Sequence, residues 1–419
     1  MRISARARRA REQYASTSFL HTADNMARMA LSGRRRALMA ALLIGAAATY
    51  LAAPYARAAS LFVRAAHPGG RVERAASMYA YAVSVGTRHT VPTRYGDVAA
   101  QFYRPSGAIS RSVLLVPGIH SMGIDEPRLT ALASDLAGSG VLVMTMALPD
   151  LQRYRITPRA TDVIEDAVTW MSRRPDLAPD GKIGIIGISF AGGLAIVAAG
   201  RPAVRDRVSF VLAFGGHGDL PRVMRYLATG EEVHVPGVNT HPPHDYGVAV
   251  ILYGLADRGV VPADQVGALR TGIETFLYAS QLTLRDMTEA NATFQKARDY
   301  AKTLPEPAET FMTYVNTRNV QKLGPALVPY LGALGADSPA LSADRAPAVP
   351  TAPVFLLHGS GDTVIPAAES VLLGDYLRGK GVNVHVLLSD LITHAEIDRT
   401  AAAAETWKLV SFWADVLER

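Results

Sequence analysis

The chain of 419 residues contains no cysteine, so it has neither disulfides nor thiolate ligands for a metal ion. Aromatic residues are few, at 7%, and no internal repeat is apparent. Hydrophobic residues make up 49% of the chain and charged residues 19%, which is enough to bury a sizeable core and excludes a disordered protein. The absence of cysteine does not separate exported from cytosolic proteins, because both classes include chains without it.

Most of the chain also has no excess of basic over acidic residues. The formal net charge is +6, but residues 1–36 hold nine arginines and only two carboxylates. The rest of the chain holds 34 basic and 35 acidic side chains, so it is nearly neutral. We therefore expect no nucleic-acid partner for the folded part of the protein.

The arginine-rich start leads into an export or anchoring signal. Arg34-Arg35-Arg36 is followed by residues 37–53, which carry no charge. Small residues at 56–58 are typical of a cleaved signal peptide, whereas the length of the apolar run approaches the ~17–25 residues that span a bilayer. We favour an uncleaved membrane anchor in residues 1–58, with the arginines inside and the following chain extracytoplasmic. The alternative is a secreted or periplasmic protein after signal cleavage.

Residues 59–94 read as a juxtamembrane linker or helix. They hold scattered arginines and apolar residues. Such a helix lies either on the membrane or against the following domain, and the sequence leaves both open.

From residue 95 onward, short apolar runs alternate with amphipathic segments. This alternation predicts an α/β fold with a mostly parallel sheet and helices on both faces. Strands are predicted at 97–104, which reads as an edge strand, and at 112–116, 141–146, 183–186, 208–214, 353–357 and 382–388, with helices near 127–138 and 162–173.

A long interruption separates two parts of this pattern. The sheet-forming parts are 95–220 and 351–419, and residues 221–350 form an insertion with helices predicted at 266–284 and 291–302. A parallel crossover needs only about a dozen residues, so these residues are predicted to be a separate helical insertion. Its aromatic residues either line a pocket or form the core of the insertion: Tyr246, Tyr253, Phe276, Tyr278, Phe311 and Tyr314.

The most informative motif is Gly187-Ile188-Ser189-Phe190-Ala191. It lies between the apolar run 183–186 and the small and apolar residues 192–199. This pattern predicts a strand, a sharp turn and a helix, with the Ser189 hydroxyl exposed at the turn and the amides of the helix N-terminus beside it. Five-residue matches recur by chance in chains rich in glycine and alanine, so it is the flanking strand and helix that favour a nucleophile over an ordinary turn.

A serine hydroxyl needs a base, and the base needs an acid to orient it. Asp362 lies in a glycine-rich turn after the strand 353–357. His394 lies after the strand 382–388. The three residues therefore occur in the order serine, aspartate, histidine.

Over residues 95–419 these motifs resemble the α/β-hydrolase superfamily of serine esterases, and within it bacterial carboxylesterases and dienelactone-hydrolase-like enzymes. The resemblance implies the α/β-hydrolase fold with residues 221–350 as a helical cap. It also implies Ser189 as nucleophile, His394 as general base and Asp362 as the orienting carboxylate. It also implies an oxyanion hole formed by the amides of Ile119 and Phe190. Two positions depart from the family pattern. Pro117 replaces the usual histidine of the oxyanion loop, and Ala191 replaces the second glycine of the turn, which we expect to stay intact.

The reaction implied is hydrolysis of small carboxylic esters through an acyl-enzyme, without metal or cofactor. A serine nucleophile argues against dehalogenases and epoxide hydrolases, which use a carboxylate at this position. Thioesterase, lipase, peptidase and acyltransferase activities use the same triad and stay open. A membrane-tethered binding domain that keeps the fold without turnover is the alternative from another class.

Other polar residues have simpler interpretations. Asp219, after the strand 208–214, is the alternative acid, and His358 at the end of a strand is expected to be structural. His120 either lines the pocket or faces solvent. The histidines of the proline-rich segment 234–244 resemble ligand spacing, but we expect no metal site, because the segment lacks the rigid backbone and further ligands that zinc requires. They are His234, His241 and His244.

Overall fold

The computed structural model describes residues 45, 47–66, 70–283, 285–334, 337–393, 396–397 and 403–419. It divides into two compact units, Met1–Ala56 and Arg57–Arg419. In the first unit the described residues are helical. Most of the predicted anchor lies outside the described residues, so the anchor and its cleavage stay predictions. No helix within the described ranges is both long and apolar enough to cross a bilayer.

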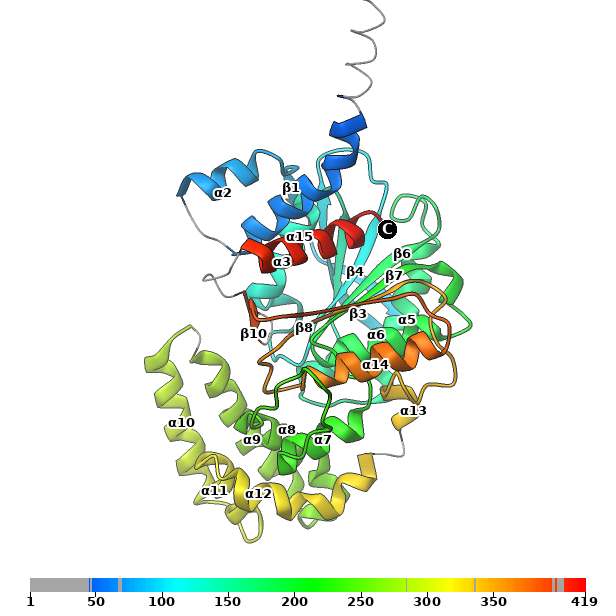
Figure 1. Cartoon of the computed structure of the whole chain (residues 1–419). Coiled ribbons are helices and arrows are strands. Elements are labelled where there is room, and N and C mark those ends of the chain that lie inside the picture. The colour runs from blue at the N-terminus through cyan, green and yellow to red at the C-terminus, as the bar shows by residue number, and fades with distance from the viewer. Residues whose placement is uncertain are drawn as a thin grey trace, which may run out of the picture. The chain divides into compact units, whose positions relative to one another are not determined.

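The second unit is built around a nine-stranded mixed sheet (Figure 1). The strand order is β1-β3-β5-β4-β6-β7-β8-β9, and β2 also pairs with β3. The strands from β5 to β9 in this order are parallel, whereas β3 runs antiparallel to β5, β1 and β2. The strands are β1 Val83–Val85, β2 His89–Thr93, β3 Gly96–Pro105, β4 Ser112–Val116, β5 Leu142–Met146, β6 Ile183–Ile188, β7 Val208–Phe214, β8 Val354–Gly359 and β9 Val384–Ser389, with a separate pair, β10 Ile392–Thr393 and β11 Glu396–Ile397.

Both faces of the sheet are covered, which explains why its central strands are continuous apolar runs. In β4, Val113 and Leu115 belong to the core on one face, and Leu114 and Val116 to the core on the other. Helices α3 and α15 cover the first face, and α5, α6 and α14 the second. The elements outside the insertion are α2 Gly70–Ser77, η1 Gly123–Asp125, α3 Pro127–Gly138, α4 Pro149–Gln152, α5 Pro158–Ser172, α6 Phe190–Gly200, η2 Arg205–Arg207, α14 Ala368–Gly379 and α15 Ala403–Leu417.

The predicted parallel sheet with helices on both faces is confirmed, but its early edge is not where the sequence indicated. The strand predicted at 97–104 forms β3, which is not an edge strand, because β1 and β2 pair with it on the side away from β5. These two strands lie within residues 59–94, which were predicted as a juxtamembrane linker or helix. Both are short and mostly exposed, so they lack the apolar run that identified the central strands.

The helical residues 57–66 also pack on this unit. Ala58 and Leu61 are buried in the core shared with α3 and α15. The Arg64 guanidinium is buried and donates to the Asp135 carboxylate at 2.8 Å and to the Ser139 hydroxyl at 3.0 Å. Residues 57–66 therefore belong to the packed core of this unit.

Between β7 and β8 the chain is helical. The core of this insertion is continuous with the sheet, because Leu252, Leu269 and Phe276 belong to the same apolar cluster as Leu114. Figure 1 shows α8 to α12 gathered at one end of the unit. The division into catalytic domain and cap stays a prediction. The elements are α7 Leu220–Thr229, α8 Asp245–Leu255, η3 Ala256–Val260, α9 Val266–Leu282, α10 Met287–Ala301, α11 Ala308–Asn316, α12 Val320–Leu327, η4 Val328–Leu334 and α13 Ser338–Leu341.

The Arg64 contact predicts the effect of removing it. Arg64→Ala leaves the Asp135 carboxylate without its buried partner, so the free energy of unfolding should fall by roughly 2–4 kcal/mol. Urea unfolding followed by circular dichroism measures this difference. The matched control is Arg74→Ala, because Arg74 is exposed on α2, and its effect should stay within about 0.5 kcal/mol. Equal effects for the two variants would contradict a docked helix at 57–66.

Candidate active site

Ser189 lies at the turn between β6 and α6, as the sequence predicted, in a strained conformation. Its φ is 55° and its ψ is −132°, a region that residues other than glycine rarely adopt. Its amide donates to the carbonyl of Phe214 at 2.7 Å, and its carbonyl accepts from the amide of Gly192 at 2.8 Å. The residue is only 8% exposed. These contacts hold the serine at the N-terminus of α6.

The turn closes only because small residues meet where strand and helix cross. A methyl group on Gly187 would lie 2.4 Å from the carbonyl oxygen of Ala191, which no ordinary contact allows. A methyl group on Gly192 would lie 3.0 Å from the Cα atom of Gly216. Ala191 itself is fully buried in the turn. The expectation that the turn tolerates Ala191 in place of glycine agrees with this geometry.

The loop after β4 reaches the same turn. A methyl group on Gly118 would lie 3.1 Å from the Ser189 Cβ and 3.1 Å from the carbonyl oxygen of Ile188. The absence of a side chain at Gly118 therefore lets this loop lie against the serine. Ile119 follows directly and is partly buried, and Phe190 is buried at the first position of α6. The oxyanion role of their amides stays a prediction.

Asp362 lies in the turn after β8, and its carboxylate is fixed by the backbone of that turn. Oδ1 accepts from the amides of Val364 at 2.8 Å and Ile365 at 3.1 Å, and the residue is buried. A methyl group on Gly215 would lie 3.5 Å from Oδ2. Gly215 follows Phe214, whose carbonyl binds the Ser189 amide. The end of β7 thus brings the Asp362 turn and the Ser189 turn together.

His358 is structural. Its Nε2 donates to the carbonyl of Ile365 at 2.9 Å, and its Nδ1 forms a hydrogen bond with the Ser370 hydroxyl at 2.7 Å. Nε2 also lies 3.5 Å from Asp362 Oδ2. The fully buried ring therefore supports the turn that carries Asp362.

The alternative acid, Asp219, is engaged elsewhere. It caps the N-terminus of α7 by accepting from the Arg222 amide at 3.2 Å. Its other oxygen accepts from the Arg345 guanidinium, with Nε at 2.8 Å. This carboxylate is held by a cap and an ion pair, which favours Asp362 as the acid of the site.

The remaining histidines divide into three cases. His394 lies outside the described residues, so its role stays a prediction. His120 is partly buried and its Nδ1 accepts from the Met122 amide at 3.2 Å. Burial lowers the pKa of His120, which favours the neutral ring. Within the described ranges, no group of three or more histidine, aspartate or glutamate residues is arranged to hold a metal ion, and the segment 234–244 forms none.

The insertion contacts both loops of the site, which the sequence did not indicate. The Ser121 hydroxyl, two residues after Ile119, donates to Gln281 Oε1 of α9 at 2.6 Å. The carbonyl of Thr363, next to Asp362, accepts from the His244 amide at 2.8 Å and from the Tyr226 hydroxyl at 3.3 Å. These helices are therefore in contact with the loop that carries Ile119 and with the turn that carries Asp362.

Two tyrosines, Tyr154 and Tyr246, lie close to these contacts. Tyr154 has a φ of 56°, is buried, and packs edge to face against Tyr253 at 6.2 Å between ring centroids. Burial raises the pKa of Tyr154 to about 12, and burial likewise raises the pKa of Tyr246, whose surroundings include Tyr154 and Asp362. Phe276 instead packs on Phe294 inside the insertion, so it belongs to the core of the insertion rather than to a pocket.

The strand order, the turn at Ser189 and the place of Asp362 after β8 fit the α/β-hydrolase fold, as the sequence resemblance implied. No protein-family model and no curated protein sequence matches the chain.

Solved structures with similar folds include an esterase from Pyrobaculum calidifontis, which is 18% identical, covers 87% of this chain and 90% of its own, and has a TM-score of 0.40. A putative dienelactone hydrolase from Klebsiella pneumoniae is 14% identical, with 80% and 98% covered and a TM-score of 0.39. Carboxyl esterase 2 from Tuber melanosporum is 13% identical, with 80% and 86% covered and a TM-score of 0.42. Similarity this distant assigns no activity to the chain.

The crossing of β6 and α6 predicts a large effect of one methyl group. Gly187→Ala forces the backbone of the Ser189 turn apart, so the free energy of unfolding should fall by at least about 1–3 kcal/mol. Gly267→Ala on α9 is the control, because a methyl group there meets no atom within 4 Å and alanine favours a helix by up to about 1 kcal/mol. Thermal unfolding separates the two variants. A Gly187→Ala protein as stable as Gly267→Ala would show that the turn is not closed as described.

Proposed function

We propose that the chain is a serine hydrolase that cleaves carboxylic esters of small molecules. The observation that carries this proposal is the convergence of three segments on one strained turn. Ser189 is held at a positive φ, Gly118 of the loop after β4 lies against it, and the Asp362 turn meets it at the end of β7. Strain of this kind costs about 1–3 kcal/mol and is concentrated at functional sites.

In the proposed reaction, Ser189 Oγ attacks the ester carbonyl while its proton passes to His394. The carbonyl oxygen becomes an oxyanion that accepts hydrogen bonds from the amides of Ile119 and Phe190. The tetrahedral intermediate breaks its bond to the alcohol oxygen, which takes the proton from His394. Water then attacks the acyl-enzyme, gives a proton to His394, and releases the acid as Ser189 is reprotonated.

Asp362 has the role of holding the His394 ring in one orientation and tautomer. Its carboxylate is suited to this because two backbone amides fix Oδ1, and the buried His358 supports the same turn. Asp219 is less suited, because its carboxylate is bound by Arg345 and by the start of α7.

The proposed place of action is extracytoplasmic, with the N-terminal segment as anchor. Its support is the arginine flank at 34–36 and the uncharged run that follows. It stays a prediction, as does the alternative of a secreted or periplasmic enzyme.

Labelling by a fluorophosphonate tests the nucleophile. The full chain should be labelled, Ser189→Ala should not, and Ser84→Ala on the exposed strand β1 should be labelled as the wild type is. Labelling that persists in a folded Ser189→Ala protein would contradict the proposal. No labelling of the folded wild type, together with no hydrolysis across a panel of acyl esters, would favour the non-catalytic binding domain.

The same ester assay separates the two candidate acids. Asp362→Asn should lower kcat by up to about 10⁴-fold, because the histidine loses the partner that sets its tautomer. Asp219→Asn should leave kcat within about tenfold once its folding has been checked, since its contacts stabilise α7 and not the triad. The reverse result would assign the acid to Asp219.

The contact between α9 and the oxyanion loop predicts an effect on turnover. Gln281→Ala releases Ser121, and with it the loop that carries Ile119, so kcat should fall more than KM changes. The loss should lie between about threefold and the roughly 100-fold expected for removal of one oxyanion donor. Gln295→Ala is the control, because Gln295 is exposed on α10 and bonds only to residues of its own helix in the described structure. Unchanged kcat in Gln281→Ala would show that the contact does not position the loop.

A further inference from the structure

The helix α2 is docked on the second unit by one face only. On α2, Glu73 is half-buried and Ala76 is buried, and Ala80, in the turn that follows the helix, is half-buried. The carbonyl of Ala76 accepts from the Ser60 hydroxyl at 2.8 Å, and the amide of Tyr81 donates to the carbonyl of Gly138 at 2.8 Å. These contacts fix the orientation of α2, so its other faces point to solvent in a defined way.

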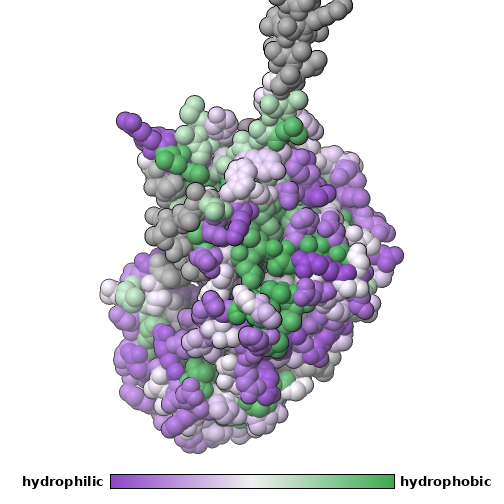
Figure 2. Space-filling view, in the orientation of Figure 1, coloured by the Kyte–Doolittle hydropathy of each residue, from purple (hydrophilic) through white to green (hydrophobic). Residues whose placement is uncertain are grey.

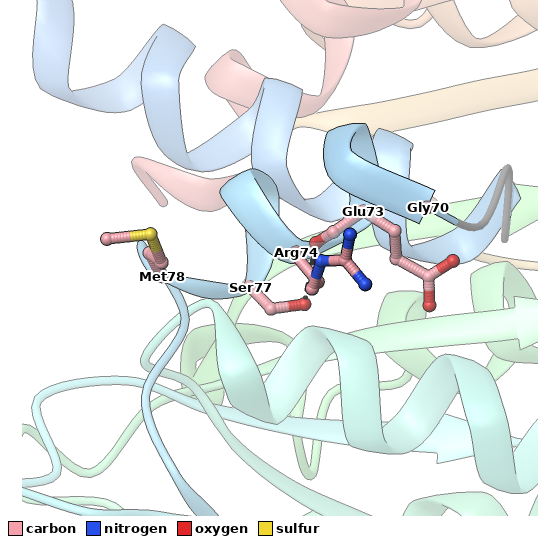
Figure 3. Close-up of a pocket in the computed structure, with 5 residues that line it drawn as sticks. All are labelled: Gly70, Glu73, Arg74, Ser77 and Met78. Carbon is pink, nitrogen blue, oxygen red and sulfur yellow. Dashed lines mark hydrogen bonds between the residues drawn. The ribbon is translucent and has the colours of Figure 1, made fainter.

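Apolar and basic side chains share the exposed faces. Arg71, Val72 and Arg74 are exposed on α2, and Met78 and Tyr79 are exposed in the turn that directly follows the helix. Met78 is 85% exposed and Tyr79 is 74% exposed. These five residues are called the α2 face below. Figure 3 shows Met78 together with Gly70, Glu73, Arg74 and Ser77, and these five residues line an open pocket at this end of the unit.

This exposure is concentrated in one stretch of the chain. Of the ten large hydrophobic side chains that are exposed in the described part of residues 57–419, five lie between 72 and 85. Figure 2 shows hydrophobic and strongly hydrophilic residues side by side over α2, at the upper left. Isolated exposed apolar residues are normal, whereas a group of them marks an interaction surface.

The charge of this region identifies the kind of partner. Residues 57–88 contain five arginines and a single carboxylate, Glu73. Two of the arginines, Arg64 and Arg88, pair with Asp135 and Asp125 of the unit, while Arg71 and Arg74 are exposed on the α2 face. Basic residues beside exposed tyrosine and aliphatic side chains suit the headgroup region of an anionic bilayer, where the rings and stems enter the interface and the cations meet phosphate.

We propose that the α2 face binds the surface of an anionic lipid bilayer. This inference is independent of the proposed function. Figure 1 places α2 at the opposite end of the unit from α9 to α12. Binding through this face therefore leaves the insertion and its contacts with the active-site loops clear of the bilayer.

The lack of cysteine allows a direct test on the full chain. Met78→Cys carries the only thiol and takes a single environment-sensitive fluorophore such as NBD. The matched control is Met287→Cys on α10, where the methionine is also exposed, at 57%. Both labelled proteins are mixed with phosphatidylcholine vesicles that contain or lack phosphatidylglycerol, with nitroxide-labelled lipid as quencher. Both keep the same N-terminal segment, so any binding by that segment is common to the two.

On anionic vesicles the label at position 78 should shift to the blue and lose most of its fluorescence to the nitroxide lipid, while the label at 287 does not. Arg71→Glu with Arg74→Glu should abolish this response, whereas the same charge change at Arg285 and Arg298 should not. A label at 78 that behaves like the label at 287 overturns the proposal. A response that survives charge reversal also overturns the proposal, because the arginines would then not bind the lipid. A blue shift without vesicles overturns it too, because the face would then be covered by the protein itself.

Discussion

A backbone constraint at Ser189 determines the arrangement of the candidate active site. A φ of 55° is costly for serine, by about 1–3 kcal/mol, and it persists only where the surroundings allow no alternative. Here the crossing of β6 and α6 leaves no room for a side chain at Gly187, and the Phe214 carbonyl binds the Ser189 amide. The same crossing directs the N-terminus of α6 at the space beside the serine hydroxyl. If this turn relaxed, the Gly118 loop and the Asp362 turn would no longer be held beside Ser189.

The insertion adds a second constraint. It is not an independent body, since its apolar core continues into the core beneath the sheet. Through Gln281 and Ser121 it contacts the loop that carries Ile119, and through the Thr363 carbonyl it contacts the turn that carries Asp362. A shift of these helices would therefore also move Ser121 and Thr363, which lie next to the residues of the candidate site.

The sequence predicted the parts of the fold in which local pattern and burial agree. The central strands are apolar runs because both faces of the sheet are covered, and the Ser189 turn has a recognisable pattern of small residues. The strands β1 and β2 are short and exposed, so they gave no comparable signal. Contacts between residues far apart in the sequence also produced no recognisable sequence pattern. Arg64 meets Asp135 71 residues away, and Ser121 meets Gln281 160 residues away. No pattern predicted the positive φ of Tyr154, and His394 lies outside the described residues.

The most direct test of the account is a crystal structure of the protein after reaction with a small alkyl phosphonate. The account predicts a phosphorus bond to Ser189 Oγ, a positive φ retained at Ser189, and the phosphonyl oxygen within about 3.1 Å of both the Ile119 and Phe190 amide nitrogens. An adduct on Ser189 with this oxygen turned to solvent, or a serine relaxed to a negative φ, would contradict it.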